Sequence, residues 1–220
     1  MMRNPKYGLL PIVVVLMAVA PAFAGPITVY GTGYNLTSNF QPDPNYVLQG
    51  GFSGILPAGC SNFPCTTYTM PAFPGWYPPD APWQWITPYS SENDNAPAGN
   101  YDYRTTFMLP SNFSSATLSG MTAMDNSGMV YLNGNLILTI TGIHGFEALH
   151  PFSDSTRSDF DSGLNTLDFV VNNIGGPTGL LVENISGSYN GGSTPEPGTF
   201  LLLGSGVLGF IGVLRRRLRR

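Results

Sequence analysis

Apolar and polar residues alternate with a period of two along the middle of the chain. The segment YDYRTTFML places one set of side chains on a single face of an extended strand: Tyr101, Tyr103, Thr105, Phe107 and Leu109. The segment NTLDFVVNN does the same with Leu167, Phe169 and Val171. A period of two is typical of a β-strand with one buried face. Both segments therefore predict strands that cover a core.

A hairpin and a last strand follow from the same pattern. MVYLNGNLILTI has two β runs around Asn133-Gly134, and this pair is the strongest short hairpin signal because both residues accept positive φ. GLLVENISGSY predicts a strand with two distinct sides. The two sets of alternating residues are Leu181, Glu183, Ile185 and Leu180, Val182, Asn184. Since no amphipathic helix stands out between these strands, the predicted fold is all-β, an antiparallel jelly-roll or β-sandwich.

The first 24 residues have the pattern of a signal peptide. Arg3 and Lys6 are followed by an apolar run of twelve residues, 9–20, and then by the small residues Ala22 and Ala24 around Phe23. This order of a basic start, a short apolar helix and an A-x-A site predicts a secretory signal helix cleaved after Ala24. Twelve apolar residues are too few to cross a membrane.

The other end of the chain also resembles a targeting segment. Residues 199–214 are mostly apolar and would span about 24 Å as a helix, against a hydrocarbon core of about 30 Å. A basic cluster follows: Arg215, Arg216, Arg217, Arg219 and Arg220. Because basic flanks stay cytoplasmic, the pattern predicts a transmembrane helix over 199–214, a basic cytoplasmic tail over 215–220 and a body outside the cytoplasm.

Charge is sparse and unevenly distributed. Charged residues make up 10% of the chain, while Gly and Pro number 27 and 20, which favours a turn-rich β fold over a helical bundle. Between Gly25 and Thr194 there are two basic residues, Arg104 and Arg157, and twelve acidic ones, for a net charge of +2 − 12 = −10. An acidic body repels phosphate backbones, so nucleic-acid binding is not expected.

The predicted body is a single β-sandwich domain over 25–190 with an insertion around 56–98 that is rich in Pro and Trp. A linker over 191–198 follows it. Within the insertion, Cys60 and Cys65 enclose four residues, and in an exported protein this spacing predicts a disulfide. A zinc site would need further ligands, and the chain has no other cysteine.

The aromatic residues of the insertion are the candidate ligand site. Sugar rings stack their C–H faces on indole rings, and nearby amides and carboxylates bind the hydroxyl groups. The residues with this chemistry are Trp76, Trp83, Trp85, Asn93 and Asp94. The alternative is that these rings pack inward beneath a Pro-rich loop, as large aromatic side chains usually do.

Metal and hydrolase chemistry have weaker support. His144, Glu147 and His150 lack the zincin spacing, because the two histidines are six residues apart. Calcium is the one cofactor kept open, although the acidic stretches SENDN and DSTRSDFDSG do not match an ordered calcium loop. A secreted hydrolase would depend on Asp154, Asp159 and Asp161. We therefore expect no enzyme activity and, calcium aside, no metal and no cofactor.

The end of the chain resembles the PEP-CTERM sorting signal of exported bacterial proteins. Pro195, Glu196 and Pro197 precede the apolar segment and the arginine cluster in the order found in that family. The resemblance implies that the secretion machinery exports the protein and that an exosortase, a membrane transpeptidase, processes it near Pro-Glu-Pro. It also implies release or transfer to the cell surface, often in species that make exopolysaccharide and biofilm matrix.

The segment from Tyr101 to Tyr189 resembles the galactose-binding-like jelly rolls common in such proteins. The matching parts are the paired aromatics, the DNSG segment before the YLNG hairpin, and the GLNTL strand. Such domains often bind sugars, although the fold alone assigns no ligand. The favoured function is a non-catalytic surface or matrix protein that binds polysaccharide; the alternatives are a structural or adhesive protein that acts through protein contacts, and a secreted hydrolase.

Overall fold

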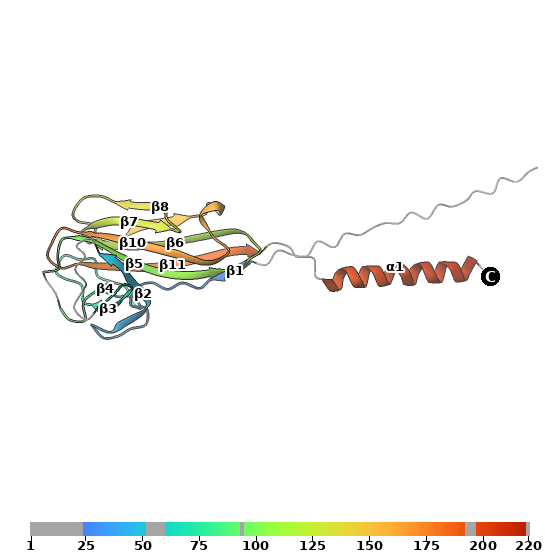
Figure 1. Ribbon diagram of the computed structural model, residues 1–220, viewed down its shortest axis with the longest axis horizontal. Coiled ribbons are helices and arrows are strands. Elements are labelled where there is room, and N and C mark those ends of the chain that lie inside the picture. Colours follow the sequence, from blue (N-terminus) through green and yellow to red (C-terminus); the bar gives the residue numbers. More distant parts are fainter. Residues whose placement is uncertain (1–23, 52–59, 93–94, 192–196, 219–220) are drawn as a thin grey trace, which may run out of the picture. The chain divides into compact units, whose positions relative to one another are not determined.

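The computed structural model describes residues 24–51, 60–92, 95–191 and 197–218 (Figure 1). Residues Phe23–Gly192 form one compact unit, the body, which is separate from the two ends of the chain. The described part of the body contains a sheet of eleven strands. Their bounds are β1 (Ala24–Ile27), β2 (Pro42–Gly51), β3 (Cys65–Met70), β4 (Trp85–Thr87), β5 (Gly99–Leu109), β6 (Phe113–Asp125), β7 (Ser127–Leu132), β8 (Asn135–Ile140), β9 (His150–Asp154), β10 (Gly163–Asn173) and β11 (Gly179–Gly191).

The sheet folds back on itself to make two layers. Its strands follow the order β8-β7-β10-β5-β2-β3-β4-β11-β6-β9, all paired strands are antiparallel, and β1 also pairs with β11. Phe169 of β10 meets Phe152 of β9 with ring centroids 5.6 Å apart, although their strands are far apart in this order. Side chains from the two layers therefore share one core, and the prediction of an antiparallel β-sandwich is confirmed.

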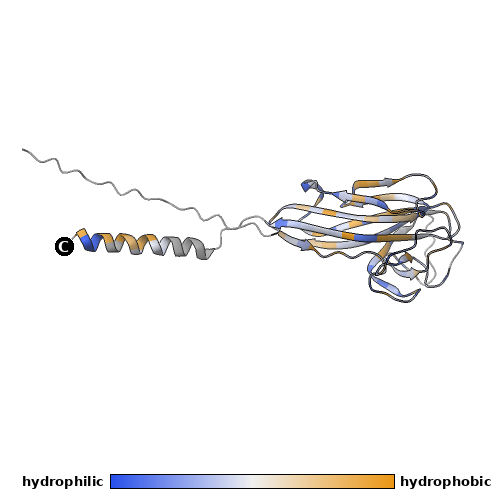
Figure 2. Ribbon diagram, turned by 180° about the vertical axis from the view of Figure 1, so that it is seen from behind, coloured by the Kyte–Doolittle hydropathy of each residue, from blue (hydrophilic) through white to orange (hydrophobic). Residues whose placement is uncertain are grey.

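The core consists of the side chains that the period-two pattern placed inward. On β5, Tyr101, Tyr103, Thr105, Phe107 and Leu109 are all buried. On β10, Leu167, Phe169 and Val171 have no exposed surface. Burial of one such large apolar side chain contributes roughly 1.5–3 kcal/mol. Figure 2 shows the resulting alternation of hydrophobic and hydrophilic residues along the strands.

The predicted hairpin is confirmed. Leu132 of β7 pairs with Asn135 of β8, so Asn133 and Gly134 form a two-residue turn. Their φ angles are 49° and 84°, in the left-handed region that this turn requires.

The predicted alternation along β11 is correct only as far as Glu183. Leu180 and Val182 belong to the main core and Leu181 to a second apolar cluster, so both faces of this part are buried. The alternation predicted that Ile185 lies on the same side of the strand as Leu181. In the structure Ile185 packs against the main core, on the opposite side. The reason is a bulge: the register with β6 shifts between Glu183 and Ser186, and Asn184 has a φ of 52°.

The Pro- and Trp-rich segment supplies strands to the sheet. β3 pairs with β2, and β4 pairs with both β3 and β11. These short strands thereby connect the two layers on one side of the sandwich. The helical structure described in the body is a single 3-10 turn, Arg157–Asp159.

A helix, α1 (Pro197–Leu218), lies at the carboxyl end and includes the predicted segment 199–214. Its last turn contains Arg215, Arg216 and Arg217, the blue end of the helix in Figure 2. Across the described ranges, no helix is both long and apolar enough to cross a membrane. The transmembrane helix therefore stays a prediction. The segment 1–23, which includes Ala22, lies outside the described residues, as do Pro195, Glu196, Arg219 and Arg220.

Candidate functional site

Polar side chains gather on the outward side of β5 and β10. Period-two alternation turns Asn100, Asp102 and Arg104 away from the core, because Tyr101 and Tyr103 point inward. The antiparallel register sets Asn172 opposite Asn100, Val170 opposite Asp102 and Asp168 opposite Arg104. These six residues, Asn100, Asp102, Arg104, Asp168, Val170 and Asn172, are the Arg104 face.

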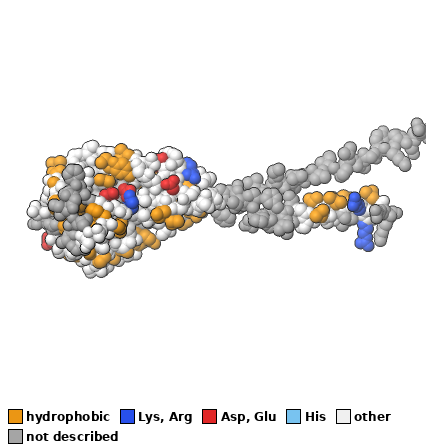
Figure 3. Space-filling model, viewed as in Figure 1, with side chains coloured by type: hydrophobic (Ala, Val, Ile, Leu, Met, Phe, Trp, Pro, Cys, Tyr) orange, Lys and Arg blue, Asp and Glu red, His pale blue; other side chains and the backbone are white. Residues whose placement is uncertain are grey.

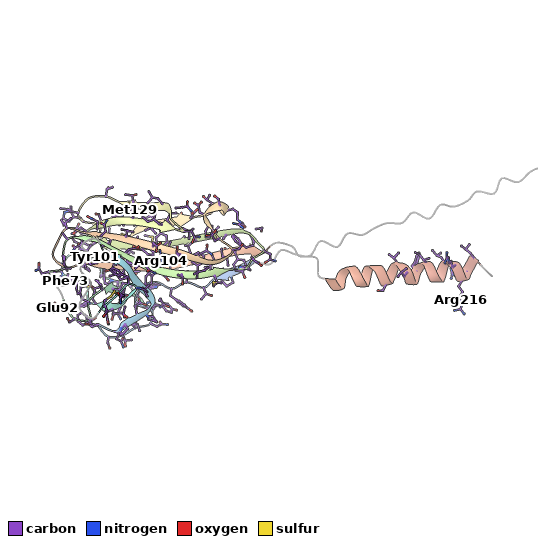
Figure 4. All side chains as sticks on the ribbon, viewed as in Figure 1. Phe73, Glu92, Tyr101, Arg104, Met129 and Arg216 are labelled. Carbon is purple, nitrogen blue, oxygen red and sulfur yellow. A yellow bond between two sulfur atoms is a disulfide. The ribbon has the colours of Figure 1, made fainter. Side chains whose placement is uncertain are left out.

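An ion pair forms the middle of the Arg104 face. Arg104 donates from Nε to Asp168 Oδ1 at 2.5 Å and from Nη2 to Asp168 Oδ2 at 3.0 Å. Two parallel bonds of this kind hold both side chains in one geometry. The Arg104 side chain remains 32% exposed and that of Asp168 12%, so the ion pair is only partly covered. Figure 4 labels Arg104, and Figure 3, from the same side, shows basic and acidic side chains next to each other.

Asp102 is a carboxyl group without a full set of partners. Its Oδ1 atom is buried and has no hydrogen-bond partner among the described residues. Burial and, to a smaller extent, the negative charge of Asp168 raise the pKa of Asp102, and Arg104 opposes the shift; the net pKa is about 6. Asp102 as a residue is partly exposed, and its carboxylate is a hydrogen-bond acceptor.

A hollow of about 410 Å³ opens at one end of the Arg104 face. Its lining residues are Ala98, Gly99, Asn100, Asn172, Asn173 and Ile174. Asn172 donates to the side chain of Asn100 at 2.7 Å, which fixes two amides at the wall of this hollow. The buried Asn173 amide donates to the carbonyl oxygens of Ala96 and Pro97 and holds the loop in place.

Strands on both sides add apolar surface to the polar groups. On β7, Tyr131 is opposite Asp168 and Met129 is opposite Val170. On β2, Val47 is opposite Arg104 and Gly50 is opposite Asp102. Apolar patches next to fixed hydrogen-bond donors and acceptors can hold a ligand whose rings have apolar faces and hydroxyl rims.

The stability of the body is expected to fall as the pH rises from about 4 to about 7. Burial raises the pKa of Asp102 to about 6 and that of Asp125 to about 7, and the pKa values of Asp43 and Glu183 are also raised. The folded state therefore binds more protons than the unfolded chain in this window, and this contribution is lost as the carboxyls ionise. Urea unfolding at a series of pH values measures the slope.

The variant Asp102→Asn is expected to reduce that slope, because the amide does not titrate. Asp161→Asn, at an exposed position, is the matched control and keeps the slope. An identical pH dependence for Asp102→Asn and the unmodified protein would contradict the role given to burial at Asp102.

Two of the three tryptophans predicted to bind a ligand lie in a core instead. Trp85 has no exposed surface, its ring centroid is 4.3 Å from that of Trp76, and its indole donates to the Tyr77 carbonyl oxygen at 2.9 Å. Trp76 is also buried, and Trp83 packs partly buried against the same cluster. The ligand prediction is wrong for Trp76 and Trp85, because their ring faces are covered. Asn93 and Asp94 lie outside the described residues.

Cys60 and Cys65 form a disulfide, with Cα atoms 5.6 Å apart. Among the described residues, no three His, Cys, Asp or Glu side chains gather to hold a metal ion. His144 pairs with Glu147 at 2.9 Å on an exposed loop.

The three aspartates considered for hydrolysis have local structural roles. Asp154 accepts the backbone N–H of Thr156 at 2.7 Å. Asp159 accepts the hydroxyl of Ser158 at 3.1 Å. The backbone N–H of Asp161 donates to Asn165 at 2.8 Å.

The sequence interpretation missed the Arg104 face. One signal could have indicated it: Arg104 is one of two basic residues in a body with twelve acidic ones, and it alternates with Asn100 and Asp102 on the polar side of a predicted strand.

Comparison with known proteins identifies the end of the chain. Residues 193–218 match the PEP-CTERM protein-sorting motif. This is a PEP-CTERM sorting signal. The prediction based on Pro195, Glu196, Pro197 and the basic cluster is confirmed, and the signal implies an exported protein that is processed at the cell envelope. Comparison with curated proteins gives no match.

Several solved structures are similar to this protein. A cyclase from Fischerella sp. TAU is 12% identical, with a TM-score of 0.47, over 78% of this chain and 100% of the cyclase. The enzymatically active domain of bacteriophage CBA120 tailspike protein 4 is 13% identical, with a TM-score of 0.41, over 71% of this chain and 20% of the tailspike chain. The CBM35 of Paenibacillus barcinonensis is 12% identical, with a TM-score of 0.35, over 72% of this chain and 97% of the module.

Proposed function

We propose that this protein is a non-catalytic component of the cell surface or extracellular matrix that binds carbohydrate through the Arg104 face. The observation that carries the binding role is the paired guanidinium of Arg104 beside Asp102, a carboxyl whose buried oxygen has no partner in the part of the chain that the structure describes. Arg104 offers donors, Asp102 offers an acceptor, and the two amides at the hollow offer both. Sugar hydroxyls need such mixed groups at fixed positions.

The delivery of the protein is part of the same proposal. A signal peptide over residues 1–24 starts export and is cleaved after Ala24. The mature chain then begins at Gly25, which pairs with Tyr189 in the sheet. A single-pass stage with the body outside the cytoplasm precedes exosortase processing near Pro195–Pro197. The protein then acts at the surface, in exopolysaccharide or biofilm matrix.

The variant Arg104→Lys is expected to weaken polysaccharide binding about tenfold or more, because lysine cannot form the two parallel bonds that orient this site. Affinity electrophoresis through gels containing neutral polysaccharides, followed by titration calorimetry with the retarding ones, measures the change. Arg157→Lys is the matched control, since it alters the other basic residue of the body, which lies over the Phe113 ring.

Equal losses of polysaccharide affinity in Arg104→Lys and Arg157→Lys would show a nonspecific effect and would contradict a binding site on the Arg104 face. Failure of the unmodified protein to bind any polysaccharide of its host matrix would remove the carbohydrate-binding role and leave the sorting signal unaffected.

A second candidate function, adhesion through protein contacts, is favoured by an exposed apolar pair. Met108 and Leu164 are opposite each other on β5 and β10 and are 64% and 60% exposed. Cross-linking on intact cells separates the two functions, because adhesion would capture protein rather than glycan at this surface.

A further inference from the structure

A second hollow, of about 310 Å³, lies on the same side of the sheet as the Arg104 face. Its lining residues are Cys60, Ser61, Asn62, Pro64, Cys65, Thr66, Tyr68 and Pro88. Thr66 and Tyr68 point outward from β3. The residues that alternate with them, Cys65 and Thr67, are buried. The loop closed by the disulfide forms one wall, so the hollow has a covalently restrained rim.

Strand register links this disulfide hollow to the Arg104 face. Thr66 is opposite Val47, and Val47 is opposite Arg104. Strands lie about 4.8 Å apart, so Thr66 is about 10 Å from Arg104 across the sheet. Asn100 is four residues from Arg104 along β5, or about 13 Å. Measured over the sheet surface, the two hollows are therefore roughly 16 Å apart, and the line between them passes over Gly50 and Asp102.

The strands between the hollows have small apolar residues beside the polar residues Gln49 and Asp102. Val47 and Val170 contribute short apolar side chains, and Gly50 contributes none. Among the described residues, a Cβ atom added at Gly50 would approach only the Cβ atom of Asp102, at 3.9 Å, which is an ordinary van der Waals contact. A floor of this kind accepts the C–H faces of consecutive sugar rings, while Asp102 and Arg104 reach their hydroxyls.

The charge of the site selects against acidic sugars. Arg104 is the basic residue of this face, and Asp168 already neutralises it. The body around it has twelve acidic residues against two basic ones. A polymer that carries a carboxylate on each sugar would be repelled by this field and would meet no free cation on the face.

We propose that this surface binds an uncharged polysaccharide along its length, with sugar residues in both hollows and the intervening ones over Val47 and Gly50. The inference rests on the proposed carbohydrate-binding function and defines its ligand: a neutral glycan chain, bound internally rather than at one terminal sugar.

Titration calorimetry with cello- and manno-oligosaccharides, from disaccharides to octasaccharides, tests the inference on the purified protein with its tail in detergent. We expect affinity to rise at least tenfold once an oligosaccharide reaches both hollows, and then to level off. Tyr68→Ala is expected to remove this rise. Arg104→Lys is expected to weaken binding at every length.

Two further variants sharpen the test. Gly50→Leu places a side chain on the surface between the hollows. It is expected to weaken the binding of long oligosaccharides more than that of disaccharides. Tyr68→Phe keeps the ring in place if Tyr68→Ala fails to fold, and it is expected to keep most of the length dependence. Thr117→Ala, on the exposed side of β6, is the control and should bind like the unmodified protein.

The outcomes separate the two proposals. An affinity that does not change with oligosaccharide length but falls in Arg104→Lys would overturn binding along the glycan chain. It would still support the proposed carbohydrate-binding function. Tighter binding of polygalacturonate than of every neutral oligosaccharide would overturn the uncharged ligand. Absence of binding to both kinds of glycan would overturn the further inference together with the proposed function.

Discussion

Deletion of residues 193–218 is expected to abolish processing at the carboxyl end and to change the destination of the protein completely. These residues form the PEP-CTERM sorting motif, and the envelope machinery that processes such proteins acts on that segment. The truncated body keeps all its described strands, because β11 ends at Gly191. Fractionation of host cells, with intact-mass analysis of the body from each fraction, measures both location and processing.

A subtler variant separates the motif from the helix. Glu196→Ala keeps the apolar segment and the arginines, and it is expected to block processing while the chain stays associated with the envelope. If the deletion variant and the unmodified protein were distributed equally among the cell fractions, and the unmodified protein kept its full carboxyl end by mass, the sorting role would be contradicted. The same masses report whether the mature chain begins at Gly25.

Replacing Trp85 by alanine is expected to lower the free energy of unfolding by about 3–5 kcal/mol. Trp85 is fully buried, packs against Trp76 and donates a hydrogen bond to the Tyr77 carbonyl oxygen. The variant therefore leaves both a cavity and an acceptor without its donor. Urea unfolding followed by circular dichroism measures the loss, which is a large part of the 5–15 kcal/mol that stabilises a typical domain.

Two matched variants keep this prediction testable if Trp85→Ala does not fold. Trp85→Phe retains part of the ring volume and is expected to lower the free energy of unfolding by less than Trp85→Ala. Trp83→Ala, at a partly exposed position, is also expected to lower it by less. Glycan affinity per folded molecule should be unchanged in all three. Lost glycan binding with unchanged stability in Trp85→Ala would instead support the earlier interpretation of this ring as a ligand platform.

The tryptophans show why composition alone did not predict which aromatic rings are buried. Aromatic rings serve equally well as sugar platforms and as core residues, and the sequence does not state which ring faces are covered. Trp76 and Trp85 became core residues because β4 pairs with β3 and β11, which brings them against Met70 and Leu181. Nothing in the spacing of the Pro-rich segment specified those partners.

The bulge in β11 shows a second limit. Alternation along a strand predicts its two faces only while the pairing register is unbroken, and the shift between Glu183 and Ser186 turned Ile185 to the main core.

Linear patterns were sufficient for the sorting signal, the β class, the Asn133-Gly134 hairpin and the buried faces of β5 and β10. Each of these depends on neighbours in the chain: a motif is recognised in order, a turn needs two residues that accept positive φ, and a strand alternates with period two. The Arg104 face depends on residues far apart in sequence. Arg104 and Asp168 are 64 positions apart, and Val47 and Thr66 join their row only through strand pairing. Period two states which side a residue faces but not which strand lies beside it, so only the tertiary structure decided the site.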